Sequence, residues 1–190
     1  MRVRGAAGLL AVMLLAAACS GDKKPAADPA PSATATPTTG VACNDQKGDA
    51  ADPSFDLLSV QLARISNKQI QVVFNTTEPP ADTPVEWVVG FVSPDGKRTV
   101  TWTADLKKNG DTAHAMAIDD NDPVPVTDPL RMTASGMATL FPSQPIDALG
   151  HGVKWYASLT LDGNEIDFCP GGADIQEVLD ITPLTLPDAW

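Results

Sequence analysis

Alternation of apolar and polar residues is the dominant pattern in this chain, and it begins near residue 58. Residues 58–63 and 69–75 each place apolar side chains at every second position, and the turn-forming sequence Ser66-Asn67-Lys68 lies between them. A period of two residues is that of a strand with one buried face, because successive side chains of a strand point to opposite sides. The two segments therefore predict a half-buried β-hairpin.

Similar segments follow along the rest of the chain. They are residues 85–91, 100–104, 112–118, 130–134, 137–141, 153–161 and 166–168. Turn-forming sequences such as Pro94-Asp95-Gly96-Lys97 and Asp162-Gly163-Asn164 separate several of them. Helical periodicity is confined to residues 173–179 and to a turn at 146–149. About eight short strands with regular turns predict an all-β fold, an antiparallel β-sandwich.

A short apolar segment without charges, residues 5–18, precedes this domain and follows Arg2 and Arg4. It falls short of the roughly 20 apolar residues that a helix needs to cross a bilayer. A basic start, a short apolar stretch and small residues before a cleavage site are typical of an export signal. The sequence therefore predicts that the chain is exported.

Cys19 follows directly on Ala16-Ala17-Ala18. This arrangement resembles the lipobox of bacterial lipoprotein signals, although Ala16 stands where the usual leucine would be. The resemblance implies cleavage before Cys19 and attachment of a diacylglyceryl anchor, with palmitate as an acyl chain, to that cysteine. The alternative is an ordinary signal peptide cleaved near Ala18, which would leave Cys19 as a free thiol.

Residues 20–42 are rich in proline, alanine, threonine and serine and contain no aromatic residue. Such a segment cannot bury enough apolar surface to offset its ordering entropy, so a disordered, semi-extended tether is predicted. The expected organisation follows from these assignments. It is a lipoprotein signal peptide at 1–18, the lipidated cysteine and tether at 19–42, the β-sandwich domain at 43–170 and a C-terminal tail at 171–190. We expect an extracytoplasmic protein, anchored by lipid to the outer face of the cell membrane.

The net charge of the 190-residue chain is −11. From residue 43 onward there are 9 basic and 22 acidic residues. This excess of negative charge argues against binding to nucleic acid and against adsorption to anionic lipid. It permits cationic partners and divalent metal ions.

Two cysteines, Cys43 and Cys169, lie at the two ends of the predicted domain. An even pair of cysteines in an exported domain predicts a disulfide bond. The alternative is a pair of metal ligands, although neither cysteine has another cysteine or a histidine close by in the sequence.

An acidic loop opens the domain and offers hard oxygen ligands, the type that Ca²⁺ prefers. Its candidate ligands are Asp45, Asp49, Asp52 and Asp56. The alternative is an acidic loop whose carboxylates only cap turns. A second acidic loop, with Asp119, Asp120 and Asp122, offers the same two interpretations.

Three tryptophans could stack against sugar rings, but Trp87, Trp102 and Trp155 all share parity with the apolar side chains of their strands. We therefore expect them in the core. Lys154 and Tyr156 have the opposite parity and are the better candidates for contact with a ligand.

The two histidines, His114 and His151, form no spaced metal-binding motif, and the chain contains no nucleophile elbow or phosphate loop. A catalytic site requires several functional side chains that converge in space, and no motif in this sequence indicates such a set. We therefore expect no catalytic residue and no enzymatic activity.

Three segments carry a resemblance to a family: Asp56-Leu57-Leu58-Ser59-Val60, residues 153–161 and residues 163–170. They resemble actinobacterial surface lipoproteins with a small Ig-like or DOMON-like β-sandwich. The loop from Asp45 to Asp49 is also similar to the loop that holds a structural calcium in carbohydrate-binding and DOMON-like sandwiches, although Lys47 adds a positive charge there. The resemblance implies a fold and no particular activity.

The functional expectation is a non-catalytic binding or adaptor module that engages an envelope protein. One alternative is a calcium- or carbohydrate-binding sandwich. A second is a cryptic hydrolase in which His151 meets a carboxylate and a hydroxyl group.

Overall fold

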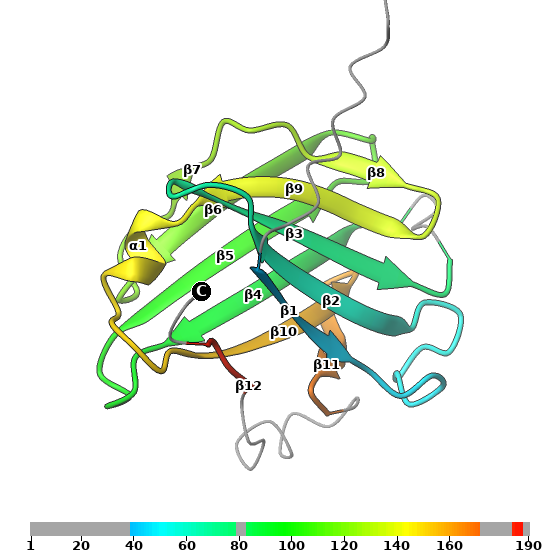
Figure 1. Cartoon of the computed structure of the whole chain (residues 1–190). Helices are drawn as coiled ribbons and strands as arrows, with labels where there is room; N and C mark the ends of the chain where they lie inside the picture. The colour runs from blue at the N-terminus through cyan, green and yellow to red at the C-terminus, as the bar shows by residue number, and fades with distance from the viewer. Residues whose placement is uncertain (1–38, 79–82, 172–183, 188–190) are drawn as a thin grey trace, which may run out of the picture. The chain divides into compact units, whose positions relative to one another are not determined.

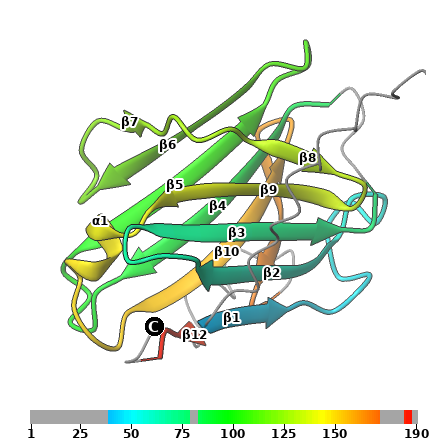
Figure 2. The same cartoon turned by 45° about the horizontal axis from the view of Figure 1, so that its top comes forward.

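The computed structural model describes residues 39–78, 83–171 and 184–187 (Figure 1). The chain divides into two units, Met1–Thr34 and Ala35–Trp190, and every described residue belongs to the second. This unit consists of two antiparallel sheets that pack face to face, as Figure 2 shows. The predicted all-β sandwich is therefore confirmed.

The five-stranded sheet has the strand order β1-β2-β3-β9-β8. Its strands are β1 (Thr39–Asn44), β2 (Leu57–Arg64), β3 (Gln69–Thr76), β9 (Gly136–Pro142) and β8 (Arg131–Thr133). The predicted hairpin between residues 58 and 75 is the β2–β3 pair, and the predicted segments at 130–134 and 137–141 correspond to the paired strands β8 and β9.

The seven-stranded sheet has the order β11-β10-β4-β5-β6-β7, and a short strand, β12, pairs with β10. Its strands are β11 (Asn164–Cys169), β10 (Lys154–Leu161), β4 (Val85–Val92), β5 (Thr99–Leu106), β6 (Thr112–Ile118), β7 (Val124–Pro125) and β12 (Leu184–Thr185). A single helical turn, α1 (Gln144–Asp147), lies in the connection between β9 and β10.

The core lies between the two sheets. It is formed by the apolar side chains that alternate with polar ones along the strands and point inward. Every second residue of β3 is buried, and β5 follows the same pattern over most of its length. Trp87, Trp102 and Trp155 are each 0% exposed, which confirms that they are core residues. Trp102 stacks on Phe141 with ring centroids 5.6 Å apart, so aromatic side chains from the two sheets meet in the centre. Burial of each such side chain stabilises the fold by about 1.5–3 kcal/mol.

The sandwich begins earlier than the sequence pattern indicates. β1 pairs with β2 in unbroken register from Thr39 opposite Arg64 to Asn44 opposite Ser59, so the expected boundary at residue 43 falls inside a strand. The segment from Thr39 to Ala42 has small side chains and the composition of a tether. Backbone pairing with β2 makes it a strand, and side-chain periodicity does not reveal that pairing.

The predicted disulfide is present and joins the two sheets. Cys43 of β1 and Cys169 of β11 are bonded, with their Cα atoms 5.9 Å apart. Both strands are terminal strands of their sheets, so the bond closes one side of the sandwich. The pairing also removes the alternative in which these cysteines are metal ligands.

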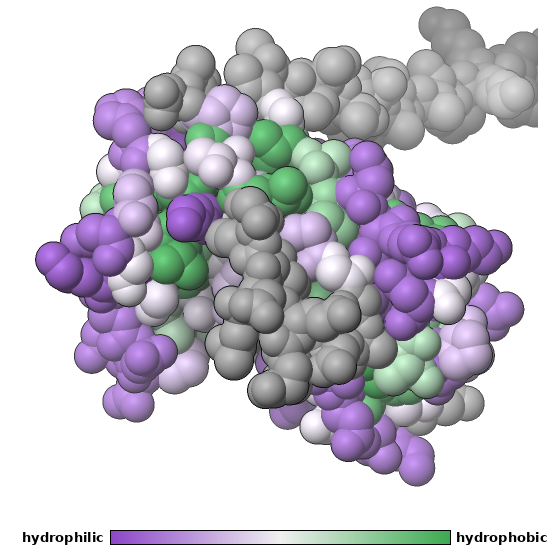
Figure 3. Space-filling model, turned by 90° about the horizontal axis from the view of Figure 1, so that it is seen from below, coloured by the Kyte–Doolittle hydropathy of each residue, from purple (hydrophilic) through white to green (hydrophobic). Residues whose placement is uncertain are grey.

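Several predictions concern residues outside the described ranges. These are the signal peptide, the lipidation of Cys19, the tether up to residue 38, the helical periodicity at 173–179 and most of the tail. No helix among the described residues is long and apolar enough to cross a membrane. On the side of the unit seen in Figure 3, strongly polar side chains gather mainly at the margins, and apolar side chains show between them.

Candidate functional site

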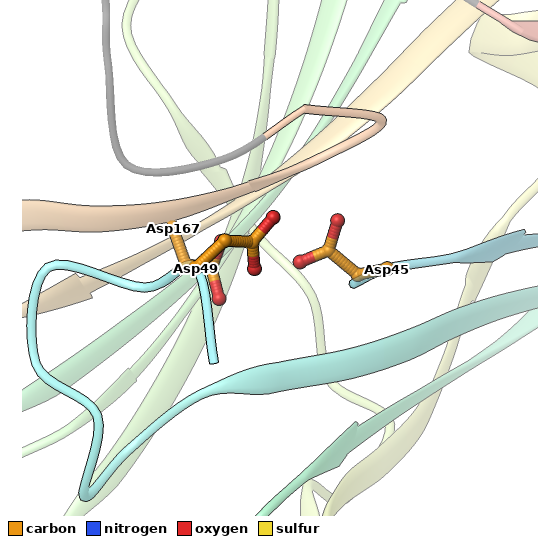
Figure 4. Close-up of side chains that lie close together, drawn as sticks. All are labelled: Asp45, Asp49 and Asp167. Carbon is orange, nitrogen blue, oxygen red and sulfur yellow. The ribbon is translucent and has the colours of Figure 1, made fainter. Parts of the chain in front are cut away.

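Three carboxylates meet beside the disulfide. One oxygen atom each of Asp45, Asp49 and Asp167 lies within 4.8 Å of the other two, and Figure 4 shows the side chains turned toward one another. Asp45 directly follows β1, Asp49 lies in the loop between β1 and β2, and Asp167 lies in β11. We call these three residues the acidic cluster.

The disulfide explains why residues so far apart in sequence meet. Cys43 precedes Asp45 by two positions, and Cys169 follows Asp167 by two positions. A step of two residues along a strand returns to the same face. Because the cysteines are bonded, the two aspartates are brought opposite each other.

Asp167 is held in place by backbone amides. Its side chain is completely buried, and its two oxygens accept hydrogen bonds from the amides of Leu57 and Phe168, each at 2.8 Å. Leu57 is the first residue of β2, so this carboxylate joins β11 to the opposite sheet. Asp167 therefore connects the two sheets near the disulfide by hydrogen bonds.

Asp56 organises the loop that carries Asp49. Its side chain is buried and accepts hydrogen bonds from the amides of Gly48, at 2.8 Å, and Ala50, at 3.4 Å. Gly48 has φ = +92°, a conformation that a residue with a Cβ adopts only with strain. The loop thus folds over the Asp56 carboxylate and directs Asp49 toward Asp167.

Two oxygens of the acidic cluster have no hydrogen-bond partner among the residues that the structure describes. Asp45 Oδ2 and Asp49 Oδ1 are shielded from solvent and accept no hydrogen bond from any group in the described part of the chain. A buried carboxylate oxygen without a partner is costly, and neighbouring like charges increase that cost. A proton or a cation shared among the three side chains would relieve both costs.

The pKa values reflect this environment. Burial, and then the negative charges of Asp167 and Asp49, raise the pKa of Asp45 to about 8. Burial also raises the pKa of Asp167 to about 6, although the amides of Leu57 and Phe168 oppose the shift. The pKa of Asp49 is raised too, chiefly by burial. Near neutral pH, therefore, Asp45 retains a proton that it can share with Asp167.

The dimensions of the cluster suit a single metal ion. Calcium binds carboxylate oxygens at about 2.3–2.6 Å, so two ligand oxygens on opposite sides of one ion lie about 5 Å apart. The spread of 4.8 Å among the three oxygens is within that limit. Three carboxylates would supply part of the six to eight oxygens that Ca²⁺ takes, and water or backbone carbonyls would supply the rest.

The structure separates the four aspartates that the sequence groups together. Asp45 and Asp49 belong to the acidic cluster, whereas the Asp56 carboxylate accepts hydrogen bonds from backbone amides of the loop. Asp52 lies outside the cluster and accepts hydrogen bonds from the amide and hydroxyl groups of Ser54, at 3.0 and 2.6 Å. Sequence reasoning missed Asp167, although its distance of two residues from a disulfide cysteine was an available signal.

The acidic loop at 119–122 differs in structure. Asp119 accepts a hydrogen bond from the amide of Thr99 at 2.8 Å and pairs with Arg98 at 3.2 Å. Asp119 and Asp120 have φ values of 50° and 58°, as in a tight turn. Among the described residues, the acidic cluster is the one set of neighbouring carboxylates whose geometry suits a metal ion.

The two histidines occupy different environments. His114 is buried, accepts a hydrogen bond from Trp102 Nε1 at 3.2 Å and contacts the carbonyl group of Asp128 through Nε2. His151 lies on an exposed loop and, with Arg64 and Asp147, lines a cavity of about 210 Å³.

The carboxylate in that cavity is engaged by neighbouring side chains. Asp147 forms an ion pair with Arg64 and accepts a hydrogen bond from Ser143 Oγ at 3.0 Å. Ser143 is itself fully buried. Its hydroxyl group is therefore shielded from a molecule in the cavity.

The two outward residues of β10 also differ. Lys154 is exposed, whereas Tyr156 is half-buried because its ring lies over Gly90 of β4. A Cβ atom added to Gly90 would come within 2.3 Å of that ring, so only glycine leaves room for it. Tyr156 therefore covers the sheet and does not project from it.

No protein-family model matches this chain, and neither a curated protein nor a solved structure shows a significant match to it.

Proposed function

We propose that this protein is a membrane-tethered, extracytoplasmic and non-catalytic binding module that acts as an adaptor for an envelope protein. The observation that supports this most is the Cys43–Cys169 disulfide, because such bonds form and persist in oxidising compartments outside the cytoplasm. The sequence adds an export signal and a cysteine placed for lipidation. In the sequence, the predicted tether lies between Cys19 and the sandwich, so it would join the lipid anchor to the domain.

The anchor is tested by replacing its acceptor, Cys19→Ser. We expect the parent chain in the membrane fraction, with an acyl group on Cys19, and the variant chain without that group. A parent chain that carries no lipid, as judged by intact mass, would contradict the anchor. The adaptor role is tested separately by cross-linking in intact cells, and failure to enrich any envelope protein would contradict it even if the anchor is present.

The acidic cluster favours a second function, the binding of a divalent cation such as Ca²⁺. Three carboxylates converge, and two of their buried oxygens lack a hydrogen-bond donor among the described residues. Calcium prefers this type of ligand. By contrast, a sugar-stacking platform made by the core tryptophans has no support, since all three are fully buried.

The cation site is tested by thermal unfolding in millimolar calcium and in chelator. A ligand present at about 100–1,000 times its dissociation constant stabilises a protein by about 3–4 kcal/mol, which raises the Tm of a domain of this size by several degrees. We expect Asp49→Asn to remove this rise. Asp52→Asn, in the same loop but outside the cluster, is the matched control and should retain it. A calcium-dependent rise that survives Asp49→Asn, or no rise in the parent chain, would contradict the site.

A further inference from the structure

Within the described part of the chain, the outer strand of the five-stranded sheet is an open edge. β1 is its terminal strand and pairs with β2 over all six of its residues. At the other end of the same sheet, β8 has only three residues. The open edge of β1 is therefore the long one, and no strand among the described residues pairs with its outward side.

The hydrogen-bond pattern shows which groups of β1 face outward. The amide of Asp45 donates to the carbonyl of Leu58 at 3.0 Å and so continues the ladder between β1 and β2. Alternate residues of an antiparallel strand bond to the same neighbour. The amide and carbonyl groups of Gly40, Ala42 and Asn44 therefore point to the open side, and all three residues are exposed.

β1 lacks the features that usually protect an edge. Natural proteins place charged side chains, prolines or bulges on long edge strands to prevent pairing with another chain. The sequence of β1, Thr-Gly-Val-Ala-Cys-Asn, contains no charge and no proline, and its register is regular. Such an edge is suited to accept a further strand.

The distribution of acidic residues indicates which strand would pair with the open edge of β1. The chain has a net charge of −11, yet the five strands of this sheet contain no aspartate or glutamate. Two copies of an acidic protein repel each other least where both surfaces lack carboxylates. The edge of β1 and the outer face next to it form such a surface.

We propose that β1 pairs antiparallel with β1 of a second copy, so that two five-stranded sheets join into one continuous sheet across a twofold axis. The outward groups match when Ala42 lies on the axis and Gly40 faces Asn44 of the second copy. Backbone hydrogen bonds would hold the two strands at the usual spacing of about 4.8 Å. Such an interface is isologous, since each copy contributes the same strand.

The oligomeric state of the processed full-length chain, measured by sedimentation velocity, tests this proposal. The critical variant is Ala42→Pro, which removes an outward amide without removing a β1–β2 hydrogen bond. The matched control is Gln61→Lys, which adds a charge on the exposed face of β2 opposite Ala42 and leaves the edge backbone intact. We expect a dimer for the parent and the control, and a dissociation constant raised at least about tenfold for Ala42→Pro.

A monomeric parent chain at all accessible concentrations would overturn the proposal. So would a dimer that Ala42→Pro leaves unchanged, or one that Gln61→Lys disrupts to the same degree, since the interface would then lie elsewhere. A photo-cross-linking residue at position 42 gives an independent measurement in cells and does not depend on the stability of the proline variant. We expect a product that contains two copies of this chain; a product with a different protein, or none, would contradict self-pairing.

Discussion

The two acidic loops of this protein have similar compositions but different structures. In the loop at residues 45–56, aspartates converge on Asp167, and two buried oxygens lack partners among the described residues. In the loop at 119–122, the Asp119 carboxylate is exposed and satisfied by the Thr99 amide and Arg98. The difference lies in what each loop packs against: the first loop joins β1 and β2 of one sheet and meets β11 of the other sheet beside the disulfide, where the Ala51 amide donates to the Ile166 carbonyl at 2.8 Å. The number of aspartates therefore says little about a site unless their burial and partners are known.

Among the changes that test this difference between the loops, loss of the disulfide should lower the free energy of unfolding most. We expect a Cys43→Ser, Cys169→Ser double variant to lose about 2–5 kcal/mol of unfolding free energy, as is typical when a small exported domain loses a native disulfide. Asp45 and Asp167 would then be released from each other, so any calcium-dependent rise in Tm should disappear as well. Urea unfolding with and without calcium measures both effects. A variant as stable as the parent would show that the disulfide does not hold the cluster together.

Removal of the buried carboxylate should have the next largest effect. Asp167→Ala leaves the amides of Leu57 and Phe168 without an acceptor in a buried position. Each unsatisfied buried donor costs about 1–3 kcal/mol, and relief of repulsion with Asp45 offsets part of this, so we expect a loss of about 2–4 kcal/mol. Asp119→Ala is the matched control, because the Thr99 amide that it frees is exposed to water. Equal losses of unfolding free energy in the two variants would contradict the contrast between the loops.

The dependence of stability on pH should follow the same contrast. The pKa of Asp45 is raised to about 8, so the folded protein holds this proton more tightly than the unfolded chain does. Its contribution to stability is complete below the ordinary pKa of an aspartate, about 4, and is lost as the pH rises toward 8.

We therefore expect Tm to fall more steeply with pH between about 5 and 8 in the parent than in an Asp45→Asn variant, which cannot titrate. Asp119 has the opposite sign, because hydrogen bonds from the Thr99 amide and Arg98 lower its pKa. Thermal melts over this pH range compare the two chains. If Tm depends on pH in the same way in the two chains, the pKa of Asp45 is not raised in the folded protein.

The smallest effect is expected in the second loop. Asp119→Asn alters an exposed carboxylate outside any metal-binding geometry that the described residues form. We expect only a small change in Tm and the same calcium response as the parent, since exposed substitutions of this type are usually nearly neutral. A loss of the calcium response would transfer the proposed cation site from the first loop to the second.

The sequence was sufficient to predict the sandwich because apolar residues recur at every second position along much of its core strands. A period of two also placed Trp87, Trp102 and Trp155 correctly in the core. Two short strands escaped prediction because β7 and β12 have two residues each, too few to show a period. The start of β1 escaped for a different reason, since backbone pairing with β2 holds its small residues in place.

The candidate site was predictable only in part. Asp45 and Asp49 lie in a conspicuous acidic loop, but Asp167 follows Ile166 in a strand far along the chain. Its place in the cluster depends on the pairing of β11 and on the disulfide, which are long-range features of the fold. The separate role of Asp56 depends on the path of the loop backbone, and no residue pattern specifies that path.

The position of the disulfide also has a mechanical consequence. The chain enters the sandwich at Thr39, and Cys43 follows only four residues later. Tension applied through the preceding segment would break the hydrogen bonds between β1 and β2 one after another, starting at Thr39. This separation would stop at Cys43. Beyond that point the load passes through the covalent bond to Cys169 on β11 in the other sheet. A pull on the N-terminal side of the domain is therefore shared between both layers and does not unravel the first.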